Sequence, residues 1–328
     1  MHLTGLGEQS DMEPRNRNLT IVIVGFVALF CLCLAATALL LSGVFISGVR
    51  TSGPAVWTGA EDNRTFAVEP GATLRVDNFA GNVTVQAGDE GHIMVVAVPH
   101  ATTSAGRERI QIQYEETVGR LEIRTTRPAG IPSAYVEFGI QVPPSTPLEL
   151  DTGSGHLEVR GVAAGVHAET GSGNVMGLGL AGDVGLHTGS GNVDLQDSTG
   201  AVSMETGSGN LTLRGIEGDI DAHTGSGRIV VEGAEGQVRV DTGTGSVEYR
   251  GMPTGECQFE TGTGSVVLYL PADLDARLDL ETNSGSVNVQ FPVDGELTRQ
   301  SVQGVIGSGE EASIRIRTGS GSIDVREY

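Results

Sequence analysis

Pairs of apolar residues recur along the second half of the chain at fixed distances from a Thr-Gly-x-Gly motif. Apolar side chains stand four and two residues before each threonine and five and seven residues after it, with Gly177 as the exception. A spacing of two within each pair is the period of a strand that buries one face. Each unit therefore predicts a strand, a tight turn at the motif, a second strand and a second turn. The motif threonines are Thr152, Thr170, Thr188, Thr206, Thr224, Thr242, Thr261 and Thr318, with a Thr-Asn-Ser-Gly variant at Thr282.

The motif repeats with a nearly constant period. The first five steps are 18 residues each, and the later steps are 19, 21 and 36 residues. A fixed period of this size is typical of a solenoid, in which each coil is covered by its neighbours. The sequence thus predicts an all-β fold, a single-stack β-solenoid like a parallel β-helix, with coils of about 18 residues. The 36-residue step predicts one degenerate coil between Thr282 and Thr318.

Two polar rows are expected to support the stack. Asn174, Asn192 and Asn210 hold equivalent turn positions, where stacked amides can hydrogen-bond along the solenoid. The inward threonines predict a similar ladder of hydroxyl groups. We interpret both rows as structural.

Strand-like alternation continues upstream of the repeat without its strict period. Residues 64–147 are predicted to form an N-terminal cap with the first coils, and residues 148–328 the repeat solenoid. The stretch from Asn78 to Val85 looks like a divergent first coil.

A long uncharged run lies near the N-terminus, from Leu19 to Ser47. It exceeds both the roughly 20 apolar residues needed to cross a bilayer and the about 7–15 residues of a signal-peptide core. We therefore expect an uncleaved signal-anchor, a single-pass transmembrane helix over residues 19–49 that contacts the membrane from Leu19 to Val49.

The flanking charges predict how this helix is oriented. Arg15 and Arg17 precede the run and only Arg50 follows it, which favours a cytoplasmic N-terminus. We expect a short cytoplasmic tail over residues 1–18, a linker over residues 50–63 and an extracytoplasmic body at the cell membrane.

Composition narrows the range of functions. The chain has 20 basic residues, all of them Arg, against 41 acidic residues, for a net charge of −21. Such a charge repels phosphate backbones, so nucleic acid is not an expected partner. Without lysine there is no P-loop and no Schiff-base chemistry. We find no catalytic constellation and no cofactor motif, and we expect neither an enzyme nor a bound cofactor.

One outward column of ionisable residues is the candidate site. The residue directly before each motif threonine alternates between acid and histidine along the middle of the repeat. Adjacent strands lie about 4.8 Å apart, so neighbours in this column can share a divalent cation or a proton. The same alternation also limits like-charge repulsion on a solvated face, and both interpretations stay open. The candidate cation column consists of Glu169, His187, Glu205, His223 and Asp241.

The repeat resembles a known family. The stretch VEFGIQVPPSTPLELDTGSGHLEVRG at residues 136–161, the tandem TGSGNV copies and the closing RTGSGSIDV at residues 317–325 are similar to the bacterial putative-adhesin family of β-strand repeat proteins, a domain of unknown function. The resemblance covers about residues 64–328. It implies a setting in or at the cell envelope, and it carries over no catalytic residue.

Three functions from different classes remain open at this point. The first is a non-enzymatic, membrane-anchored adhesin or cell-surface interaction protein, which contacts a protein, a glycan or another copy of itself. The second is an accessory protein of an envelope-stress or sensing system. The third is a polysaccharide-acting β-helix enzyme, which the scattered arginines and the acidic surface disfavour because such enzymes cluster basic residues on one face.

Overall fold

The computed structural model describes residues 57–58 and 61–328, which form a sheet of 26 strands. Most strand pairs are parallel, and each coil contributes one strand to each of two facing sides. The predicted all-β solenoid is confirmed. The run from Leu19 to Val49 lies outside the described residues. Within residues 57–58 and 61–328, no helix has the length and apolar character that a membrane span requires.

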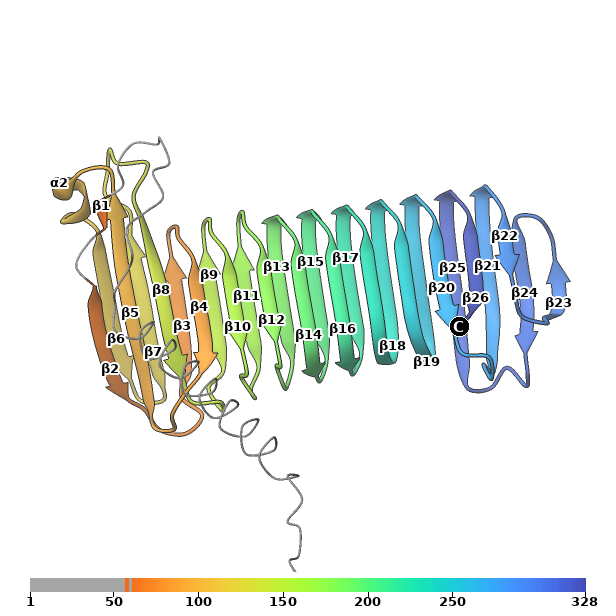
Figure 1. Cartoon of the computed structure of the whole chain (residues 1–328), viewed down its shortest axis with the longest axis horizontal. Coiled ribbons are helices and arrows are strands. Elements are labelled where there is room, and N and C mark those ends of the chain that lie inside the picture. Colours follow the sequence, from red (N-terminus) through yellow and green to blue (C-terminus); the bar gives the residue numbers. More distant parts are fainter. Residues whose placement is uncertain (1–56, 59–60) are drawn as a thin grey trace, which may run out of the picture. The chain divides into compact units, whose positions relative to one another are not determined.

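The central coils follow the predicted period, and Figure 1 shows them stacked in chain order. The strands of one side are β9 (Leu148–Thr152), β11 (Val166–Thr170), β13 (Val184–Ser190), β15 (Val202–Ser208) and β17 (Ile220–Ser226). Those of the other side are β10 (Leu157–Arg160), β12 (Val175–Leu178), β14 (Val193–Thr199) and β16 (Leu211–Glu217). β18 (Ile229–Thr244) and β19 (Val247–Thr263) are longer, because each runs through a corner from the second side of one coil to the first side of the next.

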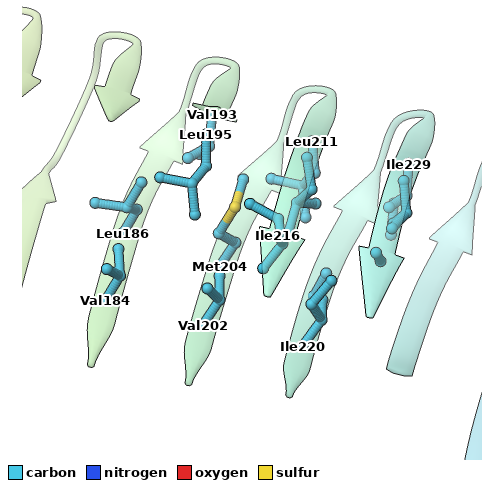
Figure 2. Packing of buried hydrophobic residues seen from close by; sticks show 14 of the residues in the cluster. Val184, Leu186, Val193, Leu195, Val202, Met204, Leu211, Ile216, Ile220 and Ile229 are labelled. Carbon is cyan, nitrogen blue, oxygen red and sulfur yellow. The ribbon is translucent and has the colours of Figure 1, made fainter. Parts of the chain in front are cut away.

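The apolar columns form the interior. Figure 2 shows Leu186 and Met204 from one side approaching Leu195 and Leu211 from the other, and all four are fully buried. Burying such a side chain contributes about 1.5–3 kcal/mol, so a narrow aliphatic interior stabilises every coil. Two predicted positions differ at the C-terminal end, where Val287 and Val289 are only partly buried.

The one break in the apolar pattern has a local cause. A Cβ at Gly177 would lie 2.6 Å from Leu195 Cδ1 and 2.9 Å from Leu180 Cδ1. Leu180, from the following turn, is buried and fills the space that an apolar side chain at position 177 would occupy.

The motif threonines bond to the backbone and not to one another. The hydroxyl of Thr188 donates to the Gly173 carbonyl at 2.8 Å, and that of Thr206 donates to the Gly191 carbonyl at 3.0 Å. The predicted hydroxyl ladder is therefore wrong in its partners. A glycine carbonyl of the preceding coil faces the threonine hydroxyl at each corner, and the bond satisfies a partly buried acceptor that costs free energy when unpaired.

The asparagine row also bonds to backbone. The Asn192 N–H donates to Asn174 Oδ1, and the Asn210 N–H donates to Asn192 Oδ1, both at 2.9 Å. Each asparagine side chain thus bonds to the next coil, as predicted, but its partner there is a main-chain N–H and not another side-chain amide. The same contact joins the His156 N–H to Asn82 Oδ1 at 2.8 Å, which identifies the stretch around Asn82 as a coil of the solenoid.

The N-terminal coil does not stand at the end of the stack. It consists of β3 (Thr73–Asn78) and β4 (Val83–Ala87), which are inserted between the coil that starts with β9 and a later coil made of β7 (Arg120–Thr126) and β8 (Tyr135–Val142). The outermost strands pair antiparallel and close this end. They are β1 (Trp57–Thr58), β2 (Asp62–Ala67), β5 (His92–Ala101) and β6 (Gln111–Thr117), with the one-turn helix α2 (Ser104–Arg107) after β5.

The C-terminal coil is inserted in the same way, so the predicted degenerate coil between Thr282 and Thr318 is wrong. The last strands, β25 (Ala312–Ser320) and β26 (Ile323–Glu327), lie between β19 with β20 (Val266–Leu270) and β21 (Ala276–Ser284) with β22 (Val287–Val289), as Figure 1 shows. Along the chain, β22 is followed by a hairpin of β23 (Asp294–Leu297) and β24 (Ser301–Ile306), which precedes β25. β24 pairs antiparallel with β21.

Charges mark both inserted coils. Arg75 of β3 lies 3.2 Å from Glu149 of β9 and 3.9 Å from Glu122 of β7. Arg317 of β25 lies 2.6 Å from Asp279 of β21. Each inserted strand thus carries an arginine that pairs with a carboxylate of a neighbouring coil.

Candidate functional site

The predicted column before the motif threonines is continuous in the structure. Glu169, His187, Glu205, His223 and Asp241 are register partners on successive strands of one side. His187 Nδ1 lies 3.6 Å from Glu205 Oε2, and His223 Nδ1 lies 3.9 Å from Asp241 Oδ2. Among residues 57–58 and 61–328, no group of three or more His, Cys, Asp or Glu side chains is placed to hold a metal ion. Cation binding by this column stays a prediction.

A second outward column lies beside the first, on the residues three positions before each threonine. It includes Asp221, whose carboxylate is 2.6 Å from His223 Nε2. Both ring nitrogens of His223 therefore face carboxylates, one from each column. The sequence analysis treated the columns separately and missed this contact, although the spacing of two residues along one strand indicates it.

An open groove of about 920 Å³ follows the second column across the corners of successive coils. Its middle is lined by small residues, among them Gly165, Gly185, Ala201 and Ser203. The charged residues that line it are mostly acidic. They are Glu149, Asp183, Asp219, Asp221 and Glu256, with Arg239 as the arginine.

Partial burial and two neighbouring acids shift the pKa of a carboxyl in the first column. The pKa of Asp151 is raised, first by its partial desolvation and then by the negative charges of Glu169 and Asp77. Repulsion between stacked acids is thus present where no histidine intervenes in the column, since Asp151 and Glu169 are direct register partners.

Two histidines meet inside the groove. His167 of β11 and His187 of β13 have ring centroids 5.3 Å apart with an interplanar angle of 50°. His167 belongs to the second column and His187 to the first, so they are diagonal neighbours across two strands. The register partner of His167 is Gly185, whose missing side chain leaves room for both rings. Sequence reasoning missed His167. The available signal was Gly185, the next residue of the second column, which leaves space beside the His167 ring.

Comparison with known families identifies the repeat. Residues 72–326 match the family model described as Toastrack DUF4097. The chain belongs to this family. The Toastrack match includes the inserted coils at both ends, all of the groove and both histidines. No curated protein gives a significant match to the chain.

Several solved structures are similar to this Toastrack chain at low identity. A putative cell adhesion protein from Clostridium sporogenes is 14% identical with a TM-score of 0.27, over 82% of this chain and 100% of that one. A putative adhesin from Bacteroides fragilis is 13% identical with a TM-score of 0.41, over 83% and 98%. A putative adhesin from Parabacteroides distasonis is 11% identical with a TM-score of 0.34, over 81% and 97%.

Proposed function

We propose that this chain is a non-enzymatic, membrane-anchored surface protein that holds an acidic β-solenoid outside the cell and binds a partner there as an adhesin does. The uncharged run over residues 19–49 supports the anchor, since it exceeds the length that a bilayer requires. Arg15 and Arg17 support the orientation, with the N-terminus in the cytoplasm.

The groove is the observation that carries the binding proposal. It crosses successive coils and is lined by five carboxylates and one arginine. An extended partner lying along the stack meets a carboxylate at several steps. Charge complementarity selects a partner that carries spaced positive charges, such as an arginine- or lysine-rich protein segment or an amine-bearing glycan. Because these contacts are solvent-exposed, binding depends on many weak pairs and weakens as salt rises.

Attachment of cells that display the full chain tests this function. We expect more attachment to surfaces coated with chitosan or polylysine than to surfaces coated with neutral dextran. Replacing Asp219 and Asp221 by Asn should reduce attachment, because both carboxylates line the groove. The matched control replaces Asp89 by Asn and Glu90 by Gln, which removes the same charge from an exposed turn of the N-terminal region.

Equal loss in the two charge-matched variants would show that only net charge matters and would refute the groove as the contact surface. The anchor is tested separately. Deleting residues 19–49 should release the chain from the membrane fraction, and protease added to intact cells should digest the body. A body that is protected until the cells are lysed would contradict the proposed orientation.

A further inference from the structure

The two histidines in the groove present ring nitrogens to one small volume. A Cβ built on Gly185 would lie 3.0 Å from His167 Nδ1 and 3.6 Å from His187 Nε2. Gly185 has no side chain, so the nitrogens of two imidazoles border a space that only glycine leaves open at this strand position. The ring centroids are 5.3 Å apart.

A carboxylate lies close to His187, on the side of the ring away from Gly185. Its other nitrogen, Nδ1, lies 3.6 Å from the carboxylate oxygen Oε2 of Glu205. Metal-ligating histidines commonly direct the second ring nitrogen to a carboxylate, which holds the proton on that side and leaves the first nitrogen free to coordinate. With the proton on Nδ1, the unprotonated Nε2 of His187 is the ring nitrogen that borders the space above Gly185.

We propose that His167 and His187 chelate a divalent transition-metal ion above Gly185, with water completing its coordination. Two neutral imidazoles favour copper, nickel and zinc over the oxygen-preferring calcium and magnesium. The expected order of affinity places Cu²⁺ above Ni²⁺ and Zn²⁺. This inference differs from the acid–histidine column predicted from the sequence, because its second ligand, His167, lies outside that column. It also goes beyond the proposed surface function and does not depend on it.

Copper titration of the untagged full chain in detergent, at pH 7.5, tests the site. All variants carry His2→Ala, which removes the imidazole next to the N-terminal amine. Calorimetry should give one Cu²⁺ per chain, and the electron paramagnetic resonance spectrum should show two nitrogen ligands. His167→Ala and His187→Ala should each lower the affinity at least about tenfold, since loss of even an outer-shell partner costs about 10–100-fold. Each single variant should also lose one nitrogen from the spectrum.

Two further variants distinguish this site from diffuse binding to the acidic face. His223→Ala should keep the wild-type affinity, because His223 contacts Asp221 and Asp241 and not the space above Gly185. Gly185→Ala retains both ligands but places a methyl group 3.0 Å from His167 Nδ1, so it should weaken binding. Unchanged affinity in both His167→Ala and His187→Ala, or an equal loss in His223→Ala, would overturn the proposal. Circular dichroism should show that each variant retains the strand content of the parent.

Discussion

The hydroxyl of Thr318 donates a 2.9 Å hydrogen bond to the carbonyl oxygen of Gly264, although 54 residues separate the two. In the regular coils the same bond joins residues 15 apart, as between Thr206 and Gly191. Thr318 therefore occupies the position that the next coil along the chain would fill. That coil, with Thr282, stands one step farther out, and its hydroxyl donates to the Gly321 carbonyl at 2.9 Å.

The inserted coil has a charge that fits its two neighbours. In the column before the motif threonines, Arg317 lies between Glu260 and Glu281, where the other copies of the repeat carry an acid or a histidine. Its guanidinium also binds Asp279 of the outer coil at 2.6 Å. An acid at position 317 would instead repel both register partners, Glu260 and Glu281. We infer that this arginine helps to select the place at which the last coil enters the stack.

Removing the Arg317 charge should therefore destabilise the C-terminal end. The side chain is about one-third exposed, so Arg317→Gln is expected to lower the free energy of unfolding by about 1 kcal/mol. Arg317→Glu should cost more, because it adds a third carboxylate beside Glu260 and Glu281. Urea denaturation measures both. A double-mutant cycle with Asp279→Asn should reveal coupling, and strictly additive losses would contradict a direct pair.

A carboxylate of the same region predicts a loss of stability in acid. Asp275 accepts hydrogen bonds from the Ser308 hydroxyl at 2.6 Å, the Ser308 N–H at 3.0 Å and the Glu310 N–H at 2.9 Å. These bonds, led by that from the Ser308 hydroxyl, lower the pKa of Asp275 from 3.8 to about 2. A depressed folded-state pKa contributes stability that is complete above the unfolded value and is lost as pH falls.

The contact between Asp275 and the β24–β25 connection should therefore loosen as the pH falls from about 4 to about 2. Hydrogen exchange of the β24–β25 connection should speed up over this window. Asp275→Asn should reduce the pH dependence of the exchange rate, since the asparagine amide does not titrate in this range. Exchange in the central coils serves as the internal reference. An identical acid response in Asp275→Asn would assign the effect to other groups.

Sequence reasoning was sufficient for the central coils because their apolar period and their register carry the same information. Leu186 and Met204 are buried because each continues a column two residues before its threonine. The order of coils at the ends was not predictable from that period, because every coil has the same apolar face and fits against any other. Arg317, at a position where the other copies of the repeat carry an acid or a histidine, was one sequence feature that set the last coil apart. His167 was missed for a related reason: its contact with His187 is diagonal and depends on the absence of a side chain at Gly185.

The threonine-to-carbonyl bond should be a measurable part of the stability of each coil. Thr206→Val preserves shape but removes the hydroxyl that donates to the Gly191 carbonyl, and Thr206 is 1% exposed. Leaving a buried acceptor unpaired costs about 1–3 kcal/mol. Because the Gly191 carbonyl is only partly buried, chemical denaturation should show a loss near the lower end of this range. Thr206→Ser, which keeps the hydroxyl, should recover most of it. Equal losses in the two variants would point to packing of the methyl group instead.

The second glycine of the Thr-Gly-x-Gly motif should be the least replaceable residue in a coil. Gly209 has a φ of +157°, and a Cβ there would lie 1.8 Å from the Gly191 carbonyl oxygen. The corners stack so closely that this backbone cannot move without displacing its neighbours, since the Gly209 N–H also donates to the Ser226 carbonyl at 2.9 Å. Replacing Gly by Ala stabilises a protein by about 0.4–1 kcal/mol where the backbone suits alanine, and destabilises it where φ is positive. We therefore expect Gly209→Ala to destabilise the chain, with a large fall in thermal midpoint or loss of folded protein. Gly139→Ala is the matched control, because its Cβ would meet nothing within 4 Å and its strand conformation suits any residue. If the two variants have the same thermal midpoint, the tight stacking of corners does not limit the sequence of the repeat.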